Sequence, residues 1–172
     1  FPKPNPEREF AEIKIYSAQS DPWRAAVEDW AGARRRVAED PIWAGWLKRE
    51  RETVEQWMAK HQDRVEWLPG WSHDGVSPKD GSRVIWTEKI PHEEGEFFSS
   101  PSDPKIEITP KLHAWWVVSF RGRHVDTMVR AAQLFRLTDD RRYADWVSGQ
   151  MDFYAENFLK WEPQRQGHPA RL

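Results

Sequence analysis

The sequence predicts an all-α fold made of α–α hairpins and interrupted by one long irregular loop. Apolar residues recur at helical spacing in two stretches before residue 63 and in two stretches after residue 110. Residues typical of helix starts, Asp-Pro twice and Thr-Asp-Asp once, precede three of these four stretches. Between residues 63 and 110 the helical spacing is lost, and prolines and glycines are frequent.

The first twenty residues favour no helix. Three prolines and a short apolar–polar alternation predict an extended arm over residues 1–20. Asp21-Pro22 then predicts a helix start, because the Asp side chain can cap free N–H groups and the fixed φ of proline suits the first helical position. The apolar stripe of this first helix consists of Trp23, Ala26, Val27, Trp30, Ala33 and Val37.

Asp40-Pro41 repeats the start signal, and we expect the second helix to pack against the first as a hairpin. Its apolar stripe consists of Trp43, Trp46, Leu47, Val54, Trp57, Met58 and His61. The loop that follows, residues 63–110, has strand-like pieces only at residues 84–87 and 106–109. Its aromatic residues indicate that the loop is ordered, since disordered segments carry few of them.

The third predicted helix follows Pro110 and is apolar on more than one side. One stripe consists of Leu112, Trp116, Phe120, His124, Thr127, Ala131, Leu134 and Phe135. The neighbouring stripe consists of Val118, Gly122, Val125, Val129 and Ala132. We therefore expect this helix to be buried on most sides. Residues 138–140 predict the cap of a fourth helix, which ends before Pro163 and completes a second hairpin.

Composition excludes several classes of function. The net charge of −2 provides no global positive field for nucleic acid, and no apolar run approaches the roughly 20 residues that span a bilayer. There are no cysteines and no histidines at metal-ligand spacing, so we expect no metal and no other cofactor. The twelve tryptophans favour a carbohydrate ligand, because the indole ring can stack on sugar rings.

Two stretches carry a resemblance to a known family. HAWWVVSFRGRH, residues 113–124, and AAQLFRLTDDRRYADW, residues 131–146, resemble the N-terminal toroid region of heparinase II/III-type polysaccharide lyases. In that family an aromatic helix with an Arg-His pair runs into a Leu-Thr-Gly-Asp-x-x-Tyr-Ala turn, and here Asp139 replaces the glycine. Asp40-Pro41-Ile-Trp also resembles the family's early helix, so the likeness covers about residues 21–161.

The resemblance implies that residues 21–172 are the N-terminal part of an incomplete (α/α) toroid, whose remainder and β-sandwich domain are absent from this chain. It implies β-elimination at uronic acids of a glycosaminoglycan or alginate, with the rest of the polypeptide as a partner. The start at Phe1 suits a mature secreted or periplasmic protein after loss of a signal, and equally suits a piece of a longer chain.

The resemblance carries no catalytic residue onto this chain. The family's catalytic Asn, His and Tyr residues lie further along, and neither Asn5 nor Asn157 stands next to a histidine. The candidates for contact with sugar or anion are His113, Trp115, Trp116, Arg121, Arg123 and His124 on the third helix, with Trp86 and His92 from the loop.

Each candidate also has a structural alternative. Arg121 and Arg123 suit capture of a carboxylate or sulfate, but both can instead form ordinary helix-surface ion pairs. His124 lies on the apolar stripe, where a buried, hydrogen-bonded histidine is the alternative. Trp115 and Trp116 point about 100° apart, so we expect one in the core and the other open to a sugar.

Two other functions are also compatible with the sequence. An α/α-barrel glycoside hydrolase needs two carboxylates across a cleft, and Glu88, Glu93, Glu94 and Glu96 are candidates for them. A non-catalytic helical module that binds carbohydrate or protein needs no such pair, and its aromatic residues would simply pack helix against helix.

Overall fold

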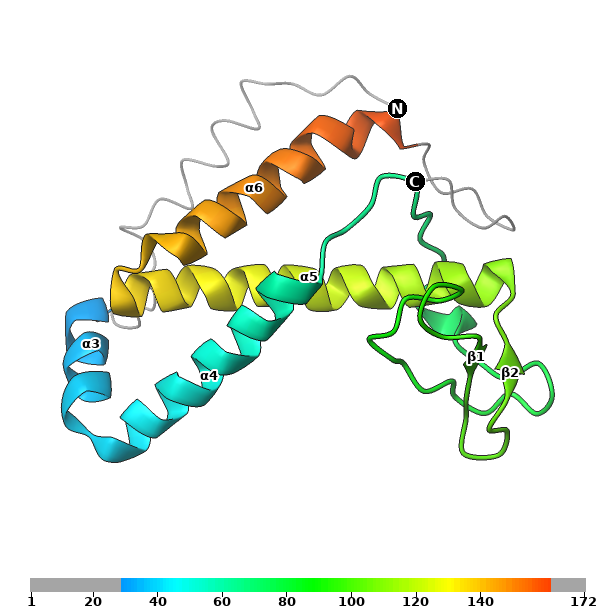
Figure 1. The fold of residues 1–172 in the computed structure, drawn as a ribbon, viewed down its shortest axis with the longest axis horizontal. Helices are drawn as coiled ribbons and strands as arrows, with labels where there is room; N and C mark the ends of the chain where they lie inside the picture. The colour runs from blue at the N-terminus through cyan, green and yellow to red at the C-terminus, as the bar shows by residue number, and fades with distance from the viewer. Residues whose placement is uncertain (1–28, 162–172) are drawn as a thin grey trace, which may run out of the picture.

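The computed structural model describes residues 29–161. The four helices are α3 (Trp30–Glu39), α4 (Pro41–Lys60), α5 (Pro110–Thr138) and α6 (Arg141–Asn157). Helix α5 is the long axis of the molecule, α4 crosses near its middle, and α6 runs back from its C-terminal end (Figure 1). The all-α prediction is confirmed at this level, and the predicted arm over residues 1–20 and the start at Asp21-Pro22 lie outside the described residues. The prediction of one unbroken first helix is wrong at Asp29, because this residue is not helical and its carboxylate caps α3 at the Gly32 N–H.

Three predicted helix starts are confirmed by their capping contacts. Asp40 accepts a hydrogen bond from the Ile42 N–H at 2.8 Å and is followed by proline at the first helical position. The Thr109 hydroxyl caps α5, and the Asp140 carboxylate caps α6. Each cap satisfies an N–H group that has no partner within its helix, which is why these local signals fix where the helices begin.

Asp139 occupies the left-handed region, with φ of 57°, and ends α5. Glycine is favoured at such a position because it has no Cβ to clash with the backbone. Asp139 adopts this conformation although it has a Cβ. The Asp139 carboxylate instead accepts a hydrogen bond from Arg34 of α3 at 3.0 Å, and the same guanidinium binds the Arg136 carbonyl.

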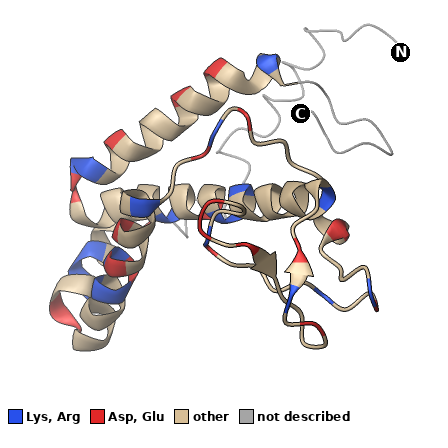
Figure 2. Ribbon diagram, turned by 45° about the vertical axis from the view of Figure 1, so that its right-hand side comes forward, with Lys and Arg blue, Asp and Glu red and all other residues tan. Residues whose placement is uncertain are grey.

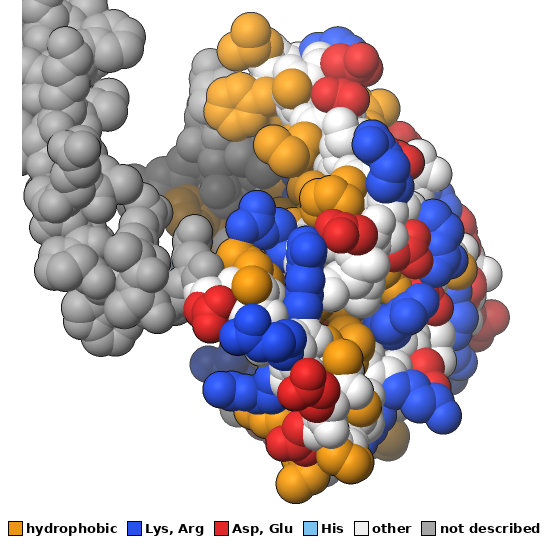
Figure 3. Space-filling view, turned by 90° about the vertical axis from the view of Figure 1, so that its left-hand side faces the viewer, with side chains coloured by type: hydrophobic (Ala, Val, Ile, Leu, Met, Phe, Trp, Pro, Cys, Tyr) orange, Lys and Arg blue, Asp and Glu red, His pale blue; other side chains and the backbone are white. Residues whose placement is uncertain are grey.

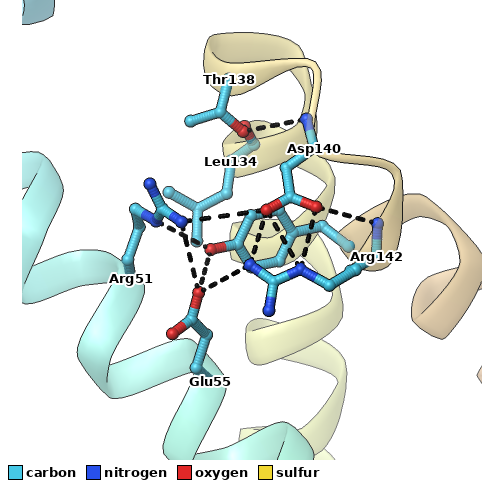
Figure 4. Close-up of polar contacts among 7 residues, drawn as sticks. Arg51, Glu55, Leu134, Thr138, Asp140 and Arg142 are labelled. Carbon is cyan, nitrogen blue, oxygen red and sulfur yellow. Dashed lines mark hydrogen bonds and ion pairs between the residues drawn. The ribbon is translucent and has the colours of Figure 1, made fainter.

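The turn between α5 and α6 is tied to α4 by a polar network around the buried Tyr143 (Figure 4). The Tyr143 hydroxyl donates to Glu55 at 2.6 Å and accepts from Arg51 at 3.1 Å. Arg142 pairs with Asp140 at 2.6 Å and reaches Glu55 at 3.4 Å. Burial, followed by the bond to Glu55, raises the pKa of Tyr143. Asp140, Arg142 and Tyr143 therefore join the turn between α5 and α6 to α4.

The core consists of two buried clusters along α5. The cluster at its N-terminal half joins the helix to the loop, through Trp67, Val84, Phe98, Ile106, Ile108, Leu112, Trp115, Trp116, Val117 and Phe120. The cluster at its C-terminal half joins it to α4 and α6, through Val54, Ala131, Leu134 and Tyr143. The expectation that the loop is ordered is thus confirmed.

Two glycines let the loop approach α5 closely. A Cβ on Gly75 would lie 2.2 Å from the Trp115 ring, and one on Gly70 would lie 2.9 Å from the Ala114 Cβ. The Gly70 N–H also donates to the Ala114 carbonyl at 2.8 Å. Both positions require glycine because the side chains of α5 already fill the space.

The strand prediction for the loop was right at one place and wrong at the other. The observed strands are β1 (Phe97–Phe98) and β2 (Ile106–Glu107), which pair antiparallel with Phe98 opposite Ile106. In residues 84–87, Ile85 makes only an isolated bridge to Ser99. The Trp86 side chain turns toward α5 instead, and Phe97–Phe98 supplies the partner strand.

The prediction that α5 is buried on most sides is contradicted for its second stripe. Val125 is 47% exposed and Val129 is 53% exposed, and nothing within residues 29–161 covers them. A small apolar hollow of about 230 Å³ also opens where α3, α4 and α5 meet, lined by Trp30, Val37, Trp43, Trp46 and Leu137 among others. Figure 3 shows this end of the molecule, where apolar side chains lie among lysines and arginines.

Candidate functional site

Arg123 and Trp86 meet on the side of α5 that faces the loop. The Arg123 guanidinium carbon lies 4.3 Å from the centre of the Trp86 ring, in the geometry of a cation–π contact. Arg123 is exposed and forms no ion pair with any described residue. Its guanidinium is therefore positioned and keeps its hydrogen-bond donors for a ligand, as the anion prediction requires.

His92 and His113 form a pair of stacked imidazoles further toward the N-terminus of α5. Their rings stack with centres 6.2 Å apart, and His113 also contacts Trp116. Neither imidazole hydrogen-bonds to another described side chain. Burial, with a smaller effect of the charge on His92, lowers the pKa of His113, and Glu93 opposes that change. We call His92, His113, Trp86 and Arg123, together with the underlying Trp116, the cation–aromatic face.

Trp115 and Trp116 are both buried, which corrects the expectation that one of them is open to a sugar. Trp116 stacks between Phe120 and Trp86, and its Nε1 donates to the Thr87 carbonyl at 2.8 Å. Trp115 points another way, against Phe98 and Gly75. The loop wraps around the N-terminal half of α5 and therefore covers both Trp115 and Trp116. The helical spacing of the sequence alone does not reveal this covering.

Trp86 also lacks an open ring face for a sugar. One side of its ring carries Arg123, and the ring stacks at 10° to that of Trp116. Among the buried side-chain polar atoms of residues 29–161, only the Trp86 Nε1 finds no hydrogen-bond partner. An unpaired indole N–H costs about 1–3 kcal/mol, so the packing here is not optimised for stability.

Arg121 is not free for a ligand, because it is held in a buried ion pair with Asp63. Its Nε donates to Asp63 Oδ2 at 2.7 Å, and its Nη2 donates to the Trp67 carbonyl at 3.0 Å. The Tyr154 hydroxyl from α6 donates to the same carboxylate oxygen at 2.8 Å. Burial, then the charge of Asp63, raises the pKa of Tyr154. The predicted ligand contact of Arg121 is thus replaced by a junction between α5, α6 and the loop.

His124 is fully buried, and both of its ring nitrogens have partners. The Trp57 Nε1–H can only donate, so His124 Nδ1, 3.0 Å away, must accept and carry no proton. The proton therefore lies on Nε2, 2.9 Å from the Gln150 amide oxygen. Burial lowers the pKa of His124 and keeps the ring neutral. The structural alternative for this residue, a satisfied core histidine, is what the structure shows.

This arrangement predicts a loss of stability in mild acid. Because the folded-state pKa values of His124 and His113 are lowered, their contribution is complete above the ordinary value of about 6.5 and is lost as pH falls below it. Urea unfolding followed by tryptophan fluorescence should show a lower midpoint at pH 5 than at pH 7.5. His124→Gln should flatten this dependence, while the exposed control His73→Gln should leave it unchanged. A midpoint that does not vary over this range would contradict the assignment.

A hollow of about 390 Å³ lies beside the cation–aromatic face, between the end of α4, the start of the loop, and α5. His61, Arg64, Trp67, Ile90 and Phe120 are among the residues that line it. The tight turn at residues 90–95 borders both features, since Ile90 lines the hollow while His92 belongs to the face.

Three of the four carboxylates proposed for a hydrolase contact protein groups. Glu93 binds Arg64, with a 3.0 Å contact between Oε2 and Nη2. Glu88 lies 3.5 Å from His61, and Glu94 accepts a hydrogen bond from the Ile90 N–H at 2.8 Å. These contacts fix the shape of the turn at residues 90–95.

The sequence reasoning missed Asp63, Tyr154 and Gln150. Asp63 enters the sequence prediction only as the first residue of the loop, and Tyr154 and Gln150 are not among its candidates. A weak signal was present, since an aspartate directly after a helix that ends in an aromatic stripe must either reach solvent or find a cation. The partner, Arg121, is 58 residues away along the chain.

No family model, curated protein or solved structure matches this chain. Among the described helices, none has a stretch that is both long and apolar enough to span a bilayer. Residues 29–161 also bring no three His, Asp or Glu side chains together around a possible metal position. Basic and acidic residues are both spread over the helices and the loop (Figure 2), so an anionic ligand would have to be held locally.

Proposed function

We propose that this chain is the N-terminal, substrate-contacting part of a polysaccharide lyase that acts on uronic-acid polymers. The observation that carries the proposal is the exposed Arg123 guanidinium, which lies on Trp86 without a carboxylate partner among the described residues. A planar guanidinium with free donors fits the two oxygens of a uronate carboxylate or a sulfate.

The helical architecture is compatible with an (α/α) toroid that further hairpins would complete. Consecutive helices α3 and α4, and α5 and α6, contact each other. The exposed Val125 and Val129 give α5 an apolar surface against which another helix can pack. On this proposal, another helix covers the exposed apolar surface of α5 in the whole enzyme.

The chemistry of elimination would come from residues outside the described chain. Removing the C5 proton of a uronate requires a base, and the carboxylate must be held by donors as negative charge develops on it. Tyr143 and Tyr154 both have raised pKa values and donate to carboxylates, which suits structural roles. The role of this chain is to bind and orient the anionic sugar.

Replacing Arg123 by glutamine is expected to weaken binding of a uronic-acid oligosaccharide by about tenfold or more, because a charge-assisted hydrogen bond contributes roughly 1.5–3 kcal/mol. Titration calorimetry with size-defined alginate and heparin oligosaccharides measures this change. Arg35→Gln is the matched control, since it removes the same charge from an exposed position on α3. Equal affinity of Arg123→Gln and Arg35→Gln would refute the binding role of Arg123.

The reaction type is tested on the whole polypeptide. Elimination leaves an unsaturated sugar that absorbs in the ultraviolet, whereas hydrolysis gives no such signal. Binding of the oligosaccharides without any absorbance change would favour the second candidate, a non-catalytic helical binding module. The two buried clusters along α5 are the observation that favours this candidate, because they give the chain a core of its own.

A further inference from the structure

His92 is placed at the cation–aromatic face by an unusual backbone conformation. Its φ is 68°, in the left-handed region that residues other than glycine seldom adopt. The surrounding turn holds it there, since the His92 N–H donates to the Gly95 carbonyl at 2.8 Å and the Glu94 N–H donates to the Ile90 carbonyl at 2.9 Å. Conformations of this kind cost of order 1 kcal/mol and concentrate at functional sites.

The consequence of this conformation is that the exposed His92 imidazole stacks on the partly buried His113 imidazole, and neither ring hydrogen-bonds to another side chain within residues 29–161. The ring centres of His92 and His113 lie 6.2 Å apart at an angle of 18°. His124, by contrast, has both ring nitrogens occupied, and His61 lies 3.5 Å from Glu88. Within the described part of the chain, the His92 and His113 rings therefore have N–H groups that can donate hydrogen bonds to a ligand.

Burial of His113 favours the neutral form of this imidazole until an anion arrives. Two protonated rings would repel each other, and partial burial of His113 adds to that cost. Glu93 is the carboxylate that faces His113, and it is already neutralised by Arg64. Lys111 on α5 forms an ion pair with Asp74 of the loop at 3.1 Å. His73, also in the loop, lies 3.8 Å from the same Asp74 carboxylate. A bound carboxylate or sulfate would supply the missing negative charge.

We infer that the His92–His113 pair is a second anion-binding point for the substrate, and that it takes up a proton from solvent when the anion binds. This inference rests on the proposed function and deepens it, because it makes affinity for the acidic polysaccharide depend on pH. The pair and Arg123 lie on either side of Trp116 along α5, so one extended anionic chain can contact both. Arg123 holds its charge at every pH, whereas His113, whose pKa is lowered by burial, adds a charge only in mild acid.

The test is calorimetric titration of the full chain with size-defined alginate and heparin oligosaccharides, in phosphate and in Tris at the same pH. The difference in apparent enthalpy between the two buffers gives the number of protons taken up per binding event. At about pH 7 we expect net uptake, and affinity should rise by up to about tenfold per pH unit as pH is lowered toward 6. His113→Gln and His92→Asn should abolish both effects, while Arg123→Gln should weaken binding but keep the proton uptake.

The control is His73→Gln, which alters an exposed histidine near the same end of α5 and should behave as wild type. His92→Asn is chosen because asparagine tolerates a positive φ, and circular dichroism checks that each variant is folded. Binding without proton uptake, or uptake that survives in both histidine variants, overturns this inference and leaves the proposed function standing. An absence of binding at every pH overturns both.

Discussion

Replacing Asp63 by alanine is expected to lower the free energy of unfolding by about 3–5 kcal/mol. The Asp63 side chain is 0% exposed and the Arg121 side chain is 12% exposed, so its removal leaves a buried guanidinium without its counter-charge. The substitution also removes the acceptor of the Tyr154 hydroxyl and of the Arg64 N–H. Urea unfolding followed by tryptophan fluorescence measures the change.

The matched control for Asp63→Ala is Asp145→Ala. Asp145 pairs with Arg141 on the exposed side of α6, with a separation of 3.8 Å, and exposed pairs contribute little to stability. We expect its effect to stay within about 0.5 kcal/mol. Similar losses in the two variants would contradict the assignment of Asp63 as a junction. The double variant Asp63→Ala with Arg121→Met should recover part of the lost stability, because it removes the unpaired charge.

Replacing Trp116 by alanine is expected to cost about 3–5 kcal/mol, the range for deleting a large buried aromatic side chain. The Trp116 side chain is 0% exposed and contacts Trp67, Trp86 and Phe120. Its removal also leaves the Thr87 carbonyl without its donor. Since Trp86 and His113 both rest on this ring, the cation–aromatic face should lose its arrangement as well.

Trp71→Ala is the control for this second prediction. Trp71 lies in the same loop but is partly exposed and stacks mainly on the exposed His73, so its loss should cost far less. Unfolding midpoints and oligosaccharide affinity are measured together on both variants. If Trp116→Ala keeps wild-type stability and affinity, Trp116 neither holds the loop on α5 nor supports the binding face.

Arg121 and Arg123 illustrate what the sequence could not separate. The two residues stand two positions apart, so their side chains leave α5 about 200° apart. Both looked equally suited to an anion, and each had an ion pair on its own helix as the alternative. In the structure Arg121 forms an ion pair with Asp63, whereas Arg123 lies on the ring of Trp86. Both of these partners come from the loop.

The sequence by itself determined where α4, α5 and α6 begin, because capping residues and apolar spacing act within a few positions along the chain. It also placed His92, His113 and Arg123 among the candidates for ligand contact. Only the tertiary structure decided which polar groups remain free and which tryptophans are covered. The loop brings Asp63, Trp86 and Gly75 against α5, and contacts between residues so distant in the chain leave no periodic trace in the sequence.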